Sequence, residues 1–166
     1  MMNIYYSRWT YFLLKRVTPN RNGPKRTNRF IAGAEFVVAL GIFLFWLAFF
    51  TQDVVNINDP HLKEIYMAFE SAFPFADFYL SLMLIIGGIG LLKNKLFGYF
   101  FSVIAGASLI FLGILDVSFN FQNGLYSIGI QEAVFNVLIN LACLSFGIYL
   151  LFAIWKSKKV GDLSVS

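Results

Sequence analysis

The stretch from 30 to 50 reads FIAGAEFVVALGIFLFWLAFF and contains a single charged residue, Glu35. An α-helix needs about 20 consecutive apolar residues to cross the hydrocarbon core of a bilayer, which is about 30 Å thick. A helix that is apolar on every face must be covered on every face, either in a large core or in lipid. The stretch therefore predicts a membrane-spanning helix.

The composition supports the same class for the whole chain of 166 residues. It is 58% hydrophobic and only 13% charged, whereas soluble domains carry about 25% charged residues. Three more apolar runs follow, without the alternation of lipid-facing β-strands. We predict an all-α, polytopic membrane protein with one domain, a four-transmembrane-helix bundle. Its expected spans are about 30–50, 73–92, 96–116 and 130–155.

Lysine and arginine residues flank these spans. They occur in the N-terminal segment 1–29, in the KNK break at 93–95 and in the tail 156–166, with Lys63 as the exception. Such residues collect on the cytoplasmic side of membrane proteins. We expect a multi-pass protein of the plasma (cytoplasmic) membrane with both termini cytoplasmic. Segment 1–29, which is aromatic and basic, is expected to be an interfacial segment and linker on that leaflet.

The expected partners follow from the same pattern. The bilayer is the main one, and a nucleic-acid partner is excluded because the charges flank apolar spans and form no continuous soluble face. Cys143 is the only cysteine and His61, in an outer loop, the only histidine. No disulfide, zinc or redox pair can form within one chain. We expect no cofactor, no metal and no catalytic residue, and we recognise no family motif.

Polar residues recur at helical spacing near the outer end of three spans. At 1.5 Å per residue, Asp77 and Asn140 should both lie about 7 Å below the outer surface, and Asp116 at the boundary. We predict an outward-facing acidic and amide-rich pocket, with walls from Phe73, Phe75, Phe78, Phe119 and Phe135. The candidate ligand-binding residues are Asp77, Asn140, Asp116, Asn136, Asn120, Glu132 and Glu70.

An alternative interpretation treats some of these residues as helix caps. Glu70 and Glu132 fall in the expected first turns of spans 2 and 4, where a carboxylate is favoured by the helix dipole. Asn123 would then be a cap or an interfacial residue. Glu35 lies near the inner face, apart from the other acids, and could reach back toward Arg29 or Lys93.

Three functions remain open at this level. The first is binding or translocation of a small solute, cation or lipid through the outward-facing pocket. The second is a structural or accessory subunit of a membrane complex, as a homo-oligomer or with another subunit. The third is an intramembrane lipid-modifying enzyme that uses Asp77 with Asp116. We rank it last because no nucleophile–base arrangement is present.

Overall fold

The computed structural model describes residues 26–51 and 57–162. For residues 131–132 and 158–162 it describes the backbone but not the side chains. The expected interfacial segment therefore lies almost wholly outside the described residues.

The described chain is helical and contains no strand. The elements are α2 (Arg26–Thr51), α3 (Pro60–Glu70), α4 (Phe73–Leu92), α5 (Leu96–Gln122), the short 3-10 helix η1 (Leu125–Ser127) and α6 (Ile130–Asp162). Four segments are long and apolar enough to cross a membrane: α2, α3 with α4, α5, and most of α6. The predicted all-α fold with four spanning helices is confirmed.

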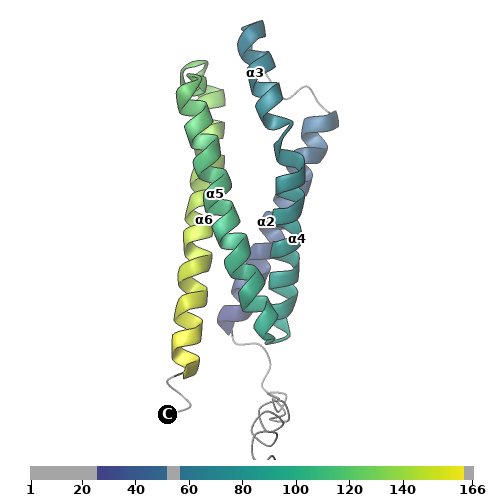
Figure 1. Cartoon of the computed structure of the whole chain (residues 1–166), viewed down its shortest axis with the longest axis vertical. Coiled ribbons are helices and arrows are strands. Elements are labelled where there is room, and N and C mark those ends of the chain that lie inside the picture. Colours follow the sequence, from purple (N-terminus) through teal and green to yellow (C-terminus); the bar gives the residue numbers. More distant parts are fainter. Residues whose placement is uncertain (1–25, 52–56, 163–166) are drawn as a thin grey trace, which may run out of the picture.

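The spanning helices pack in chain order. α2 lies against α4, α4 against α5, and α5 against α6. Figure 1 shows that the start of α2, the α4–α5 turn and the end of α6 lie at one end of the molecule, and α3 lies at the other. Five exposed basic residues lie on these three segments: Arg26, Arg29, Lys93, Lys95 and Lys156. We call this the basic end of the molecule, and the opposite end the α3 end.

Two glycines bring α4 and α5 together near the basic end. A Cβ added to Gly98 would lie 2.3 Å from the backbone nitrogen of Leu91, and one added to Gly90 would lie 2.3 Å from the Cα of Gly98. Small residues allow such close approach between helices in lipid, where packing contacts replace the hydrophobic effect as the source of association. The turn between them places Asn94 at a φ of 49°.

The outer loop expected at 51–72 contains a helix. α3 begins with Pro60 in its first turn, and the Asp59 carboxylate accepts hydrogen bonds from the backbone N–H groups of His61 (2.9 Å) and Leu62 (3.2 Å). Proline at the first position and aspartate at the N-cap are the usual start of a helix. These two residues start a helix in a segment whose polar composition had suggested a loop.

α5 also extends beyond its expected end. The helix continues for six residues past Asp116 and ends at Gln122. Asn123 is its C-cap, and the Asn123 side-chain Nδ2 donates to the carbonyl of Phe119 at 2.9 Å. Asn123 is thus a cap, as the alternative interpretation proposed, whereas Asp116 lies well inside the helix.

Candidate ligand-binding pocket

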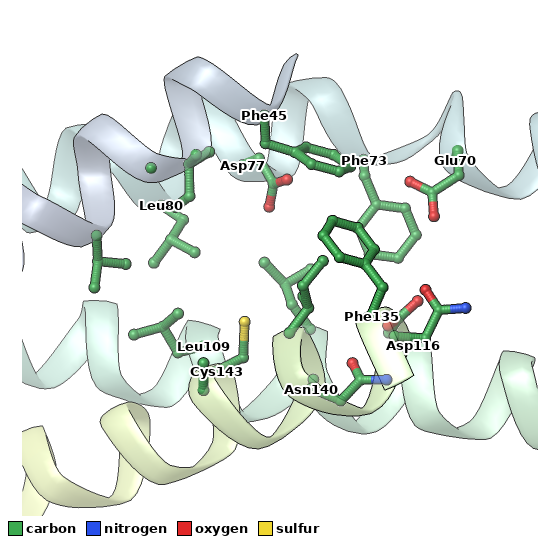
Figure 2. A pocket seen from close by; sticks show the side chains of 18 of the residues that line it. Phe45, Glu70, Phe73, Asp77, Leu80, Leu109, Asp116, Phe135, Asn140 and Cys143 are labelled. Carbon is green, nitrogen blue, oxygen red and sulfur yellow. The ribbon is translucent and has the colours of Figure 1, made fainter. Parts of the chain in front are cut away.

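A cavity of about 350 Å³ lies between the α2–α4 pair and the α5–α6 pair. Three carboxylic acids line it, each from a different helix: Glu70 from α3, Asp77 from α4 and Asp116 from α5. No lysine, arginine or histidine is among the described residues that line it. We call this cavity the acidic pocket (Figure 2).

The acidic pocket has a polar and an apolar end. In Figure 2, Glu70, Asp116 and Asn140 lie toward one end, and Leu80 and Leu109 toward the other. Most other lining residues are apolar, among them Val38, Ile42, Phe45, Leu112 and Ile139. A largely apolar cavity with a few convergent polar groups is the usual form of a small-molecule site.

Asp77 is held by a residue that the sequence analysis missed. The indole Nε1 of Trp46, on α2, donates a hydrogen bond to Asp77 Oδ2 at 2.9 Å. Trp46 is buried, with 9% of its surface exposed, and its ring packs edge-on against Phe45 and Phe49. The indole fixes the Asp77 carboxyl through one of its two oxygens. Asp77 is therefore a positioned acid at the wall of the pocket.

Asp116 faces two amides. The side-chain amides of Asn120 and Asn140 lie near its carboxyl group and interact with it electrostatically. The Nδ2 of Asn140 donates to the hydroxyl of Tyr126, on η1, at 3.1 Å, which fixes the orientation of that amide. Asn120 is 1% exposed and its amide makes no hydrogen bond within the described part of the chain. Asn140 lines the acidic pocket, whereas Asn120, one turn after Asp116 on α5, does not.

Glu70 is not an N-terminal cap. It is the last residue of α3, is only 8% exposed, and lies beside the hydroxyl of Tyr66. A carboxylate at the C-terminal end of a helix gains nothing from the helix dipole, so the capping interpretation of this residue was wrong. Glu70 is also near enough to Asp116 and Asp77 for their charges to repel its own.

The expected aromatic walls are only partly present. Phe73 and Phe135 line the pocket, but Phe75 and Phe78 are 88% and 71% exposed and point away from it. Phe119 instead stacks on Phe69 of α3, with ring centroids 3.7 Å apart and planes 2° from parallel. This stack joins α3 to α5 beside Glu70 and Asp116.

The remaining candidates are distributed as follows. Asn136 lines the pocket with Asn140, one turn further along α6. The side chain of Glu132 lies outside the described residues. Glu35 does not line the pocket, and its carboxyl is buried with no hydrogen-bond partner, so it does not reach Arg29 or Lys93.

Several lining residues carried no signal in the sequence. Tyr66 lies in a segment expected to be a loop, and Cys143 lies in a uniformly apolar run. Trp46 follows Glu35 by eleven residues, about three helical turns, so the two share a face of α2, but this spacing does not indicate the bond from Trp46 to Asp77.

The three carboxyls are spread along the pocket wall and do not surround a point. Among the described residues, no group of three His, Cys, Asp or Glu side chains could hold a metal ion. Acids arranged in this way can contact separate parts of a ligand that is larger than one ion.

The protein was also compared with protein-family models, curated proteins and solved structures, and none of them matches.

Proposed function

We propose that this integral membrane protein binds, and moves across or within the membrane, a small amphipathic cation that occupies the acidic pocket. The observation that carries the proposal is the presence of three carboxyls from three helices in one largely apolar cavity, with no basic side chain among the described lining residues. An organic amine would place its charged group beside Asp77 and its apolar part against Leu80 and Leu109.

The energetics favour this class of ligand over an anion or a neutral molecule. Acids buried in a membrane protein are costly unless they are paired or hydrogen-bonded. Asp77 accepts a hydrogen bond from Trp46, and Asp116 lies near the amides of Asn120 and Asn140, but the described residues that line the pocket include no cation. A bound ammonium group would supply that missing charge through short, charge-assisted hydrogen bonds.

We further propose that the protein resides in the plasma (cytoplasmic) membrane with its basic end in the cytoplasm. The support is the collection of Arg26, Arg29, Lys93, Lys95 and Lys156 at that end, which the positive-inside rule associates with the cytoplasm. In this orientation the acidic pocket lies toward the outer side, near α3.

Binding of 4-phenylbutylamine and of the neutral 4-phenylbutanol tests the proposal with two probes that differ mainly in charge. Protein in lipid nanodiscs would carry W9F and W155F, so that Trp46 is the only tryptophan. Its indole bonds to Asp77, so a ligand that contacts Asp77 should change its fluorescence. We expect saturable quenching or a spectral shift with the amine and a much weaker response with the alcohol.

Asp77→Asn is the decisive variant, because an amide oxygen can still accept the bond from Trp46 while the charge is lost. A charge-assisted hydrogen bond contributes about 1.5–3 kcal/mol, and about 1.4 kcal/mol corresponds to tenfold in Kd. The amine should therefore bind about tenfold more weakly or worse. Glu64→Gln, which removes an exposed carboxyl on α3, is the matched control and should leave Kd unchanged. Equal affinity for the amine in native protein and Asp77→Asn would refute the assignment.

The accessory-subunit alternative is favoured by one feature of the packing. α2 and α6 each make extensive contacts with only one other spanning helix, and both expose large apolar side chains such as Phe43 and Phe152. Native mass spectrometry of the extracted protein distinguishes the two ideas. A defined complex with a second protein supports an accessory role, whereas a monomer or homo-oligomer that binds the amine supports the pocket.

A further inference from the structure

Glu35 is a fully buried acid that the acidic pocket does not use. It lies on α2, with 0% of its surface exposed, and neither carboxyl oxygen has a hydrogen-bond partner within the described residues. A Cβ added to Gly87 of α4 would lie 3.0 Å from Glu35 Oε1 and 2.9 Å from Ser102 Oγ of α5. The carboxyl is therefore enclosed where α2, α4 and α5 meet.

The packing beside the carboxyl is tight, because a single carbon added at Gly87 would be in close contact with Glu35 Oε1 and with both Oγ and the backbone nitrogen of Ser102. An isolated carboxylate in such surroundings is strongly destabilising. A neutral carboxylic acid does not carry this cost, and it has one O–H group to donate.

Ser102 is arranged to accept that hydrogen. Its own hydroxyl donates to the carbonyl of Gly98 at 2.8 Å, and its Oγ lies beside the carboxyl of Glu35, since Oγ and Glu35 Oε1 approach the same point next to Gly87. The resulting chain would run from the Glu35 acid to the Ser102 hydroxyl and on to the Gly98 carbonyl. A serine that already donates in one direction stabilises a protonated acid and not a carboxylate, which needs donors.

Further polar groups lie between this site and the basic end. Asn28 is 0% exposed and precedes Glu35 by seven residues, about two turns on the same face of α2. Its Nδ2 donates to the Tyr99 hydroxyl at 2.8 Å and to Asn94 Oδ1 at 3.2 Å, and its own Oδ1 has no partner. Tyr99 precedes Ser102 by three residues on α5, so the two side chains are neighbours on that helix.

No comparable line leads toward the acidic pocket. Asp77 precedes Gly87 by ten residues on α4, about 15 Å along the helix, and buried Ala39, Leu80 and Leu84 belong to the core between them. The described charged groups at the basic end are all exposed: Arg26, Arg29, Lys93, Lys95 and Lys156. The tyrosine hydroxyl of Tyr99 is therefore the titratable group closest to this site along α5.

We propose that Glu35 is a proton-binding site, loaded and unloaded from the basic end through Asn28 and Tyr99, and that release of its proton requires α2 to separate from α4 and α5 at that end. This inference does not depend on what the acidic pocket binds. The direction of the pH dependence follows from the charge of Glu35. The closed packing is stable while Glu35 is protonated, and it is lost as the pH rises and the carboxylate forms.

Infrared difference spectroscopy on the full chain in lipid nanodiscs tests the proton directly, because protonated and ionised carboxyls absorb in separate regions. At neutral pH we expect a protonated-acid carbonyl band that disappears in Glu35→Gln and remains in Glu64→Gln. Ser102→Ala should keep this band and shift it to higher frequency, since it removes the acceptor. An unchanged carbonyl region in Glu35→Gln, or an unshifted band in Ser102→Ala, would overturn the assignment.

Cysteine labelling tests the movement of α2. In a Cys143→Ser background, Ala32→Cys places a thiol at a site that is 0% exposed in the closed packing. Lys95→Cys, in the exposed α4–α5 turn, corrects for the intrinsic effect of pH on thiol reactivity. We divide the maleimide labelling rate at position 32 by the rate at position 95. We expect this ratio to rise with pH in the otherwise native chain and to be independent of pH in the chain that also carries Glu35→Gln. A flat ratio in both would overturn the proposed opening.

Discussion

Gly98→Ala should test whether the α4–α5 contact determines the fold. The added Cβ would lie 2.3 Å from the Leu91 nitrogen and 2.4 Å from the Gly90 carbonyl carbon, whereas ordinary contact begins at 3.4 Å. Both neighbours are backbone atoms and cannot rotate away, so the helices must move apart by about 1 Å. Overpacking of this kind costs about 1–3 kcal/mol, and the lost contacts along the interface add to it.

The assay is equilibrium unfolding in mixtures of dodecylmaltoside and sodium dodecyl sulfate, followed by far-UV circular dichroism. Gly33→Ala is the matched control, because a Cβ there meets no atom within 4 Å and alanine is the better helix former by about 1 kcal/mol in water. We expect Gly98→Ala to lower the free energy of unfolding by about 1–3 kcal/mol and Gly33→Ala to leave it unchanged or slightly higher. Equal stability of the two variants would refute the argument that close approach at Gly98 is required.

Three further substitutions probe contacts beyond this crossing. Trp46→Phe removes the donor to Asp77 Oδ2 and should lower the free energy of unfolding by about 1–3 kcal/mol in the same detergent assay; no change would mean that the bond contributes nothing. Asp59→Ala removes the N-cap of α3 and should cost about 1 kcal/mol, seen as faster amide hydrogen exchange in the first turn of α3 with α5 unaffected. Phe119→Leu keeps an apolar side chain but removes the ring stacked on Phe69, and should cost about 0.5–1.5 kcal/mol, with faster exchange in α3; equal exchange rates would show that the stack does not hold α3 in place.

Part of the acidic pocket could be predicted from sequence because a helix has a fixed rise. The rise per residue alone placed Asp77 and Asn140 at similar depth, and both line the same cavity. Spacing also grouped Asn136 with Asn140. The rise per residue gives the depth of a residue but not the direction in which its side chain points from the helix axis. Phe75 and Phe78 were therefore assigned to the pocket wall, although they face away from it.

Other errors arose where a hydropathy pattern ended. Glu70 was assigned to the first turn of a span, but Pro60 and the Asp59 cap begin a separate helix, and Glu70 ends it. The extension of α5 beyond Asp116 was missed because its last turns are polar. In both cases, capping and helix continuation depend on backbone hydrogen bonds, to which hydropathy is insensitive.

The sequence by itself determined the class of the protein, its four spanning helices and the gathering of basic charge at one end. These are local properties, because a helix in lipid satisfies its own backbone hydrogen bonds and needs only a sufficiently long apolar run. Only the tertiary structure decided which polar groups meet. Trp46 and Asp77 are 31 residues apart, and their pairing depends on the rotation of α2 against α4. The same packing encloses Glu35 beside Gly87 and Ser102, because side chains from three helices close around it.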